Sequence, residues 1–222
     1  MKMISPTDAL IFDLDGTLVQ SIEFDDALYQ EAMVEVIGCR DFDMCWESYT
    51  HVTDTGLLVE LLARLGIADT QQIIGDVRNV FCNKVRDYLE SGAACRPMPG
   101  AREAISALTV AGVQFGIATG GWGDTARMKL KYAGIEAPDF LSSSDDAISR
   151  TGIMRHCSQQ LGAHERSVVY FGDAPWDVKA TTELSWRFVG VGTRLEGMCD
   201  VWIADFFDPQ WLAVQQIVTA DV

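Results

Sequence analysis

The second half of the chain alternates between short apolar runs and helical stretches of about ten residues, and this rhythm strongly constrains the fold. Such alternation is typical of right-handed strand–helix–strand units, which place parallel strands in one sheet with helices on both faces. The expected strands are 113–118, 140–141, 167–171, 187–191 and 201–204, and the expected helices are 101–111, 125–133, 153–161, 178–184 and 209–218. We therefore predict an α/β protein whose core is a Rossmann-like, doubly wound parallel sheet.

A further apolar run, Leu10 to Phe12, precedes a long stretch that contains no good strand. Apolar residues at helical spacing predict three helices in this stretch, over residues 22–37, 53–65 and 71–89. A cluster of prolines and a glycine at residues 96–100 then marks a crossing between domains. We predict two parts, an α/β core of residues 1–20 and 92–222 and an all-helical cap of residues 21–91, inserted after the first strand.

The chain carries a formal net charge of −15, because 17 lysines and arginines face 32 aspartates and glutamates. Nucleic acids and anionic membrane surfaces both attract basic segments, so neither is an expected partner. No apolar run approaches the roughly 18 residues of a membrane span, and no signal peptide is visible. The 6 cysteines form no CxxC pair, which favours reduced thiols and a cytoplasmic protein. A monomer and a homodimer both remain open.

Several carboxylates and one hydroxyl follow the expected strands, at the edge where α/β sheets bind their ligands. Asp13 and Asp15 end the first strand, Thr119 ends the second, and Asp173 and Asp177 follow a later one. Crowded carboxylates repel one another, and Mg²⁺ relieves this repulsion because it prefers oxygen ligands and binds phosphate. One carboxylate is then placed to act as a nucleophile, and another as a general acid and base.

Three motifs carry a resemblance to a known enzyme family. They are Phe12-Asp13-Leu14-Asp15-Gly16-Thr17-Leu18, Ile117-Ala118-Thr119-Gly120 and Phe171-Gly172-Asp173-Ala174-Pro175-Trp176-Asp177. In this order on predicted strand ends, the chain resembles the haloacid dehalogenase-like superfamily of phosphohydrolases, in the helical-cap subclass that includes phosphoglycolate phosphatase-like enzymes. The resemblance extends over nearly the whole chain. It implies a Mg²⁺-dependent phosphatase that hydrolyses a small soluble phosphate monoester through an aspartyl-phosphate intermediate.

The resemblance also implies roles for individual residues. Asp13 is expected to be the nucleophile and a magnesium ligand. Asp15 is expected to be the general acid and base, with its backbone carbonyl on the metal. Thr119 and the backbone amide of Gly120 are expected to hold the phosphoryl group. Asp173 is expected to bind magnesium directly, and Asp177 to bind it directly or through another ligand.

The family also places a lysine or arginine between the second and third motifs, where it neutralises the phosphoryl oxygens. The familiar form is a lysine followed closely by proline, but residues 140–167 of this chain contain no lysine. Arg150, just before an expected helix, is our preferred candidate because its planar donors suit phosphate recognition. Arg155 is the second choice, because it lies within that helix.

Other functions require other residues. A dehalogenase lacks a second carboxylate like Asp15, and a phosphonatase needs a suitably placed cap lysine where this chain has only Lys84, so both are disfavoured. A calcium loop at residues 13–24 is excluded, because it needs glycine and glutamate where Leu18 and Phe24 stand. A phosphoglucomutase-like sugar-phosphate mutase would keep every motif and remains an alternative, as does a non-catalytic phosphate-binding or phosphoacceptor protein.

Four further residues near the expected site have no assigned role. His51 and Asp54 lie where related caps carry a specificity loop, so substrate contact is a weak expectation for both. Trp122 and Trp176 follow strands at the ligand edge of the sheet, and both are expected to pack instead of touching substrate.

Much of the negative charge belongs to the predicted cap, since residues 21–91 hold fourteen acids and five bases, a net charge of −9. An acidic lid over an anion site disfavours long polyanions and highly charged substrates. We therefore expect a small phosphate ester, with a leaving group that is neutral or cationic.

Overall fold

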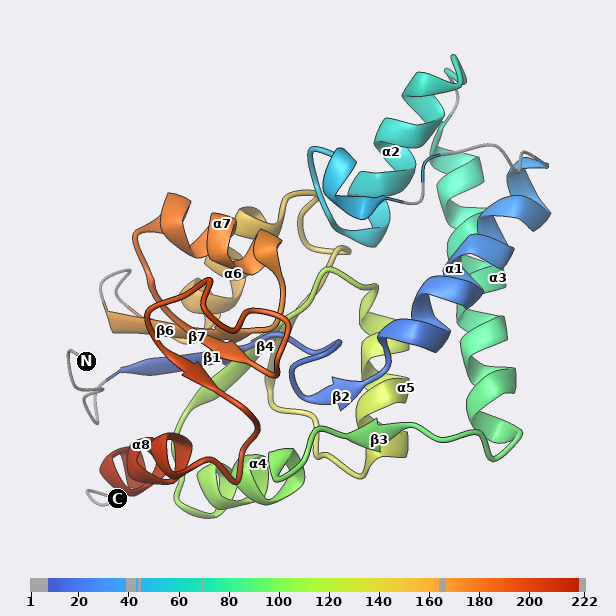
Figure 1. Cartoon of the computed structure of the whole chain (residues 1–222). Coiled ribbons are helices and arrows are strands. Elements are labelled where there is room, and N and C mark those ends of the chain that lie inside the picture. Colours follow the sequence, from blue (N-terminus) through green and yellow to red (C-terminus); the bar gives the residue numbers. More distant parts are fainter. Residues whose placement is uncertain (1–7, 39–42, 44, 69, 164–166, 220–222) are drawn as a thin grey trace.

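The computed structural model describes residues 8–38, 43, 45–68, 70–163 and 167–219. Its centre is a six-stranded sheet of order β5-β4-β1-β6-β7-β8, in which every neighbouring pair is parallel (Figure 1). The strands are β1 (Ala9–Phe12), β4 (Phe115–Ala118), β5 (Phe140–Ser142), β6 (Val168–Gly172), β7 (Arg187–Val191) and β8 (Trp202–Ile203). Strand order runs outward from β1 in both directions, so the predicted Rossmann-like, doubly wound core is confirmed.

Helices cover both faces of this sheet. Successive side chains of β1 point to opposite faces and therefore pack against different helices. The helices are α4 (Ala101–Val110), α5 (Gly123–Ala133), α6 (Arg150–Gln160), α7 (Pro175–Leu184) and α8 (Pro209–Thr219). Ile11 packs with residues of α6 and α7, whereas Leu10 and Phe12 pack with residues of α4, α5 and α8. Phe12 stacks on Phe171 with 4.7 Å between ring centroids, and Trp211 meets both rings edge-on.

Helix α6 begins earlier than the apolar pattern predicted, and this corrects the expected place of Arg150. The side chain of Ser149 accepts a hydrogen bond from the Gly152 N–H at 3.1 Å and thereby caps the helix. Arg150 is consequently the first residue of α6 and does not precede it. First turns are set by capping side chains more than by apolar spacing, so the periodic signal starts too late.

The three helices predicted for residues 21–91, here called the helical insert, are present. They are α1 (Ile22–Ile37), α2 (Asp54–Arg64) and α3 (Thr70–Glu90), with a short 3₁₀ helix, η1 (Trp46–Ser48), between the first two. Helices α1 and α3 lie side by side, and α2 lies above the carboxyl end of the sheet (Figure 1).

The chain enters and leaves the helical insert through a small antiparallel ribbon. Its strands are β2 (Val19–Gln20) and β3 (Arg96–Pro97), which pair with each other and not with the main sheet. The sequence indicated only a break at residues 96–100, because a strand of two residues has no detectable periodicity. The ribbon packs against α5 of the core.

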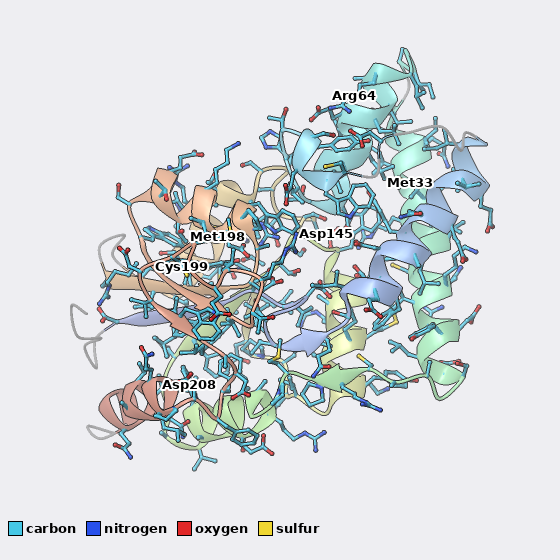
Figure 2. All side chains as sticks on the ribbon, viewed as in Figure 1. Met33, Arg64, Asp145, Met198, Cys199 and Asp208 are labelled. Carbon is cyan, nitrogen blue, oxygen red and sulfur yellow. The ribbon has the colours of Figure 1, made fainter. Side chains whose placement is uncertain are left out.

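Aromatic rings and polar contacts hold the helical insert on the core. Phe81 of α3 is buried, with its ring centroid 5.3 Å from Tyr29 of α1 and 5.8 Å from Trp122 of the core. Arg78 of α3 forms an ion pair of 3.1 Å with Asp145 of the core, and Figure 2 labels Asp145. The insert therefore lies closed over the carboxyl edge of the sheet.

The structure bears on two sequence expectations, the absence of a membrane span and the state of the cysteines, for the described residues. Among the described residues, no helix is long and apolar enough to cross a lipid bilayer. The five cysteines within the described ranges are free thiols, whereas Cys39 lies outside those ranges.

The aromatic junction predicts a stability effect. Replacing Phe81 with alanine removes a fully buried ring and leaves a cavity between Tyr29 and Trp122, which costs about 3–5 kcal/mol of unfolding free energy. Val110→Ala is the matched control, since Val110 is 86% exposed and should change stability by less than about 0.5 kcal/mol. Chemical denaturation compares the two variants, and similar losses for both would contradict this description of the junction.

Candidate active site

A cavity of about 430 Å³ lies at the carboxyl ends of β1, β4 and β6, beneath the helical insert. The structure brings six of the predicted site residues into its lining: Asp13, Asp15, Thr119, Gly120, Arg150 and Asp173. The seventh, Asp177, is completely buried behind them. Residues from four distant parts of the sequence therefore meet at one place.

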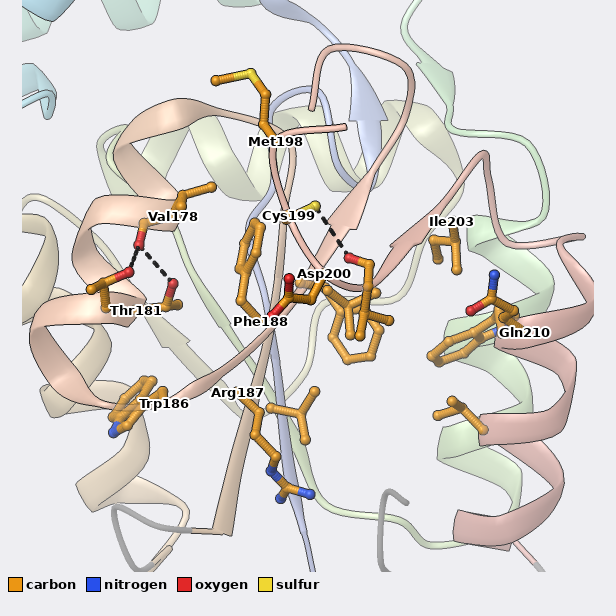
Figure 3. A pocket seen from close by; sticks show the side chains of 17 residues that line it. Val178, Thr181, Trp186, Arg187, Phe188, Met198, Cys199, Asp200, Ile203 and Gln210 are labelled. Atoms are coloured by element: carbon orange, nitrogen blue, oxygen red, sulfur yellow. Dashed lines mark hydrogen bonds between the residues drawn. The ribbon is translucent and has the colours of Figure 1, made fainter. Parts of the chain in front are cut away.

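A second cavity, of about 410 Å³, lies beside β7 and β8, between α7 and α8. Figure 3 shows Trp186 on the α7 side of this cavity and Gln210 on the α8 side. Its lining is mostly apolar, with Arg187 and Asp200 as the charged residues, and it includes none of the predicted site residues. Arg187 forms an ion pair with Asp8 at 2.5 Å. The predicted site residues thus gather around the first cavity and not around this one.

Three buried carboxylates form the centre of the site. Asp13, Asp173 and Asp177 each offer an oxygen, and these oxygens lie within 4.8 Å of one another. Gly172 at the end of β6 permits this approach, because a Cβ there would lie 2.6 Å from the Asp177 carboxyl carbon. The Ala174 N–H donates to Asp177 Oδ2 at 3.1 Å, which fixes the carboxylate at the start of α7.

Arg150 supplies the positive charge at this centre. Its Nη1 lies 3.0 Å from Asp13 Oδ1 and 3.0 Å from Asp177 Oδ1. The same nitrogen donates to the Tyr170 hydroxyl at 3.3 Å, and that hydroxyl donates to the Ala118 carbonyl at 2.9 Å. Arg150 Nε is buried without a hydrogen-bond partner among the described residues.

The electrostatics of the cluster show that it lacks positive charge. Burial raises the pKa of Asp13 well above its usual range, and repulsion from Asp177 and Asp173 offsets part of the lowering by Arg150. Burial and the charge of Asp177 together raise the pKa of Asp173 to about 7. Arg150 and the more exposed Arg194, whose Nη1 lies 3.9 Å from Asp173 Oδ2, do not offset three buried carboxylates, because charges held out of water interact strongly.

This donor set fits a divalent cation. The three carboxylates supply hard oxygen ligands from the ends of two neighbouring strands, β1 and β6, and from the first turn of α7. Their raised pKa values indicate that further positive charge would stabilise the ionised forms. Asp13 and Asp173 also line the cavity, so a cation held there would be in reach of a ligand. The backbone carbonyl of Asp15 stays a predicted ligand.

The second motif presents small groups to the cavity. Thr119 Oγ1 accepts a hydrogen bond from the Gly121 N–H at 3.1 Å, which orients the hydroxyl. A Cβ on Gly120 would lie 2.9 Å from the Val52 carbonyl and 3.1 Å from Arg150 Nη2. Gly120 is therefore required where the helical insert and the arginine approach the end of β4.

Asp15 is held by partners that the sequence analysis missed. Lys129 Nζ of α5 lies 2.5 Å from Asp15 Oδ1 and 2.9 Å from Asp25 Oδ1 of α1. The Ser21 hydroxyl donates to the same oxygen of Asp15. A lysine in an amphipathic helix usually indicates a solvated position, so the sequence held no signal that Lys129 is buried.

Two of the four unassigned residues, Trp122 and Asp54, bind each other at the junction between insert and core. Trp122 is buried, as expected for a packing residue, and its backbone N–H donates to Asp54 Oδ2 at 2.9 Å. Burial raises the pKa of Asp54 well above its usual range, and the charge of Asp25 raises it further. Asp54 also lines the cavity.

The other two unassigned residues lie nearer the surface. Trp176 lines the cavity at its outer part, and the Arg194 guanidinium lies 4.7 Å from the centre of its ring. Trp176 is therefore within reach of a ligand, whereas only packing was expected. His51 is not among the lining residues of this cavity.

Comparison with known proteins places the chain in a family. The sequence model of the haloacid dehalogenase-like hydrolases matches residues 7–183, which include all three motifs. The chain therefore belongs to the haloacid dehalogenase-like hydrolase family. A comparison with curated proteins finds no match.

Solved structures share the fold. A hydrolase from Pseudomonas syringae is 24% identical, with a TM-score of 0.66 and 87% of each chain covered. CbbY from Rhodobacter sphaeroides in complex with phosphate is 18% identical, with a TM-score of 0.74, covering 95% of this chain and 99% of that one. A β-phosphoglucomutase from Clostridium difficile is 15% identical, with a TM-score of 0.71, covering 94% and 96%. At these identities the likeness establishes the fold.

The turn after Asp15 generates a prediction about the cluster. Gly16 has a positive φ of +83°, and a Cβ there would lie 2.6 Å from the Asp173 carboxyl carbon. If a divalent cation binds this cluster, Mg²⁺ should raise the melting temperature of the native protein, and Gly16→Ala should displace Asp173 and abolish that increase.

Gly38→Ala is the matched control, because Gly38 has a φ of +74° and a Cβ there would have no described atom within 4 Å. That variant should lose only the about 1–2 kcal/mol of a strained left-handed backbone and keep its response to Mg²⁺. The same Mg²⁺ response in both variants would contradict the assignment.

Proposed function

We propose that the protein is a Mg²⁺-dependent phosphatase that hydrolyses a small soluble phosphate monoester through an aspartyl-phosphate on Asp13. The observation that carries this proposal is the position of Arg150, with one nitrogen 3.0 Å from both Asp13 and Asp177. A guanidinium beside a carboxylate nucleophile provides the charge that a phosphoryl group needs there. Membership of the hydrolase family supports the same reaction class.

In the first step, a carboxylate oxygen of Asp13 attacks phosphorus in line with the ester oxygen. The new phosphorus–oxygen bond forms as the ester bond breaks, and Asp15 gives its proton to the leaving oxygen. In the second step, Asp15 takes a proton from water, and the water oxygen attacks phosphorus. Phosphate leaves and the Asp13 carboxylate is restored.

The remaining site residues stabilise charge on the phosphoryl oxygens. Arg150, Thr119 and Gly120 all line the cavity, and their guanidinium, hydroxyl and backbone amide are the proposed donors. Such donors act strongly because they are already oriented and shielded from bulk water. Asp13, Asp173, Asp177 and the Asp15 carbonyl would hold Mg²⁺, which supplies Lewis-acid stabilisation when bound.

We further propose that residues 21–91 form a cap on a core of residues 1–20 and 92–222. The Asp54 N–H donates to the Gly120 carbonyl at 2.8 Å, and the Thr53 hydroxyl donates to the Ile148 carbonyl at 2.6 Å. A cap in this position would exclude bulk water during phosphoryl transfer and select the leaving group.

Replacing the nucleophile tests the reaction. Asp13→Asn should reduce kcat by about 10³-fold or more, since an amide does not form the acyl-phosphate. Asp87→Asn is the control, because Asp87 lies exposed on α3. Release of inorganic phosphate from a panel of small esters, with and without Mg²⁺, is the measurement. Retained turnover in Asp13→Asn would refute the nucleophile, and isomerised sugar phosphate without free phosphate would indicate a mutase.

The charge of the outer cavity predicts a preference among substrates. The helical insert contributes four charged residues to the lining, and all are acids: Asp25, Asp26, Glu47 and Asp54. Asp26 has only the Trp46 indole N–H, at 3.0 Å, as a described hydrogen-bond donor. A negative leaving group would be repelled at this end, whereas a cationic one would be attracted.

An aminoalkyl phosphate should therefore have a kcat/KM about tenfold above that of a carboxyalkyl phosphate of the same length, a difference of about 1.4 kcal/mol. Asp26→Asn should narrow this ratio and leave the rate on a neutral hydroxyalkyl phosphate nearly unchanged. Steady-state kinetics on the three esters provides the comparison. A preference for the carboxyalkyl ester would contradict the charge argument.

A further inference from the structure

Lys129 is a buried charge to which the proposed chemistry assigns no step. Its side chain is completely buried, and its Nζ lies 2.5 Å from Asp15 Oδ1 and 2.9 Å from Asp25 Oδ1. Asp15 belongs to the catalytic loop after β1, whereas Asp25 belongs to the first turn of α1 in the helical insert. One ammonium therefore joins the general acid and base to the proposed cap.

The position of α5 suits such a connection. The helix starts directly after the second motif, packs against α3 of the insert, and packs against both strands of the β2–β3 ribbon (Figure 1). Its Lys129 therefore reaches the place where the chain passes from the core into α1. A movement of α1 away from the core would separate Asp25 from Lys129.

The contacts of Asp15 show which of its oxygens is free to react. Lys129 and the Ser21 hydroxyl both donate to Oδ1. Oδ2 instead lies towards the end of β4, since a Cβ on Gly121 would lie 3.8 Å from it and 3.5 Å from Thr119 Oγ1, and both of these residues line the cavity. The donors thus fix the carboxylate by one oxygen and turn the other towards the proposed phosphoryl site.

A purely structural role explains this arrangement poorly. Burying an ammonium with two carboxylates leaves one excess negative charge out of water, and buried ion clusters seldom stabilise a fold more than apolar packing does. Charge-assisted hydrogen bonds of this kind are nevertheless short and directional, so they determine orientation well. The two donors on Oδ1 therefore orient the Asp15 carboxylate.

We infer that Lys129 is a positioning residue that orients Asp15 with Oδ2 towards the leaving-group oxygen. Because Lys129 also binds Asp25, this orientation depends on contact between the helical insert and the core. The inference rests on the proposed function, because it concerns proton transfer by Asp15. It predicts that loss of Lys129 impairs acid assistance more than it impairs substrate binding.

The test uses the full chain and two esters that differ in how much they need a proton. An alkyl phosphate needs a proton on its leaving oxygen, whereas p-nitrophenyl phosphate expels a stable anion. The variants are Asp25→Asn and the charge-balanced pair Lys129→Met with Asp25→Asn, which removes one charge of each sign. Lys131→Met is the control, because Lys131 lies exposed on the same helix.

The double variant should lose about 100-fold in kcat on the alkyl ester, the scale of general acid catalysis. Its KM and its initial burst of p-nitrophenol should change by less than about threefold, because neither depends on acid assistance. Asp25→Asn should lose activity on the alkyl ester to a smaller extent. Because Asp15 also acts as the base in the second step, the two esters are compared by the rate of the first step. Equal losses of that rate on both esters, or a smaller burst amplitude, would overturn the inference and indicate a structural role.

Hydrogen exchange separates this inference from the proposed function. Amides of residues 22–28 should exchange faster in Asp25→Asn and in the double variant than in the native protein or in Lys131→Met. If the native protein hydrolyses no ester, the proposed function fails. Unchanged exchange in the variants would show that the contact of Lys129 with Asp25 does not hold α1 on the core. If the native protein is active but exchange is unchanged, the inference alone fails.

Discussion

Mutual repulsion among carboxylates held out of water is the constraint on which this structure depends. Asp13, Asp173 and Asp177 bring their oxygens within 4.8 Å at one edge of the sheet. Such a cluster is costly unless cations offset it, because charges interact strongly where water is excluded. The protein offsets part of it with Arg150 from the start of α6 and with Arg194, 3.9 Å from Asp173, and a bound divalent cation would reduce the remaining deficit of positive charge.

The same constraint explains how the helical insert is placed. A second buried cation, Lys129, binds Asp15, the proposed general acid and base, and reaches the insert through Asp25. Around it, Trp122 of the core packs against Phe81 of the insert. A change in the position of the insert would therefore disturb the contacts of the loop that carries Asp15. Charge and packing therefore meet at one boundary, where the chain crosses between its two predicted parts.

Much of the fold follows from sequence because its signals are periodic: apolar strands end at acidic or glycine residues, and helices alternate between them. The strands of the ribbon and the first turns of α5, α6 and α7 escaped this reasoning, since they are too short or too polar to show a period. Among site residues, Arg150 was chosen by elimination, and the structure places it against Asp13. Lys129 and Asp25 were missed, because a lysine in a helix and an acid in an acidic segment both indicate solvent until tertiary structure buries them.

The central claim is that Asp13 carries the phosphoryl group for part of each turnover. The most direct measurement is to mix the native protein with Mg²⁺ and substrate, quench it in acid within one turnover, and analyse the peptide that contains Asp13 by mass spectrometry. The account predicts that this peptide gains the mass of one phosphoryl group, and loses it again at later times as free phosphate appears. Complete hydrolysis of the ester with no phosphorylated peptide at any time would contradict it.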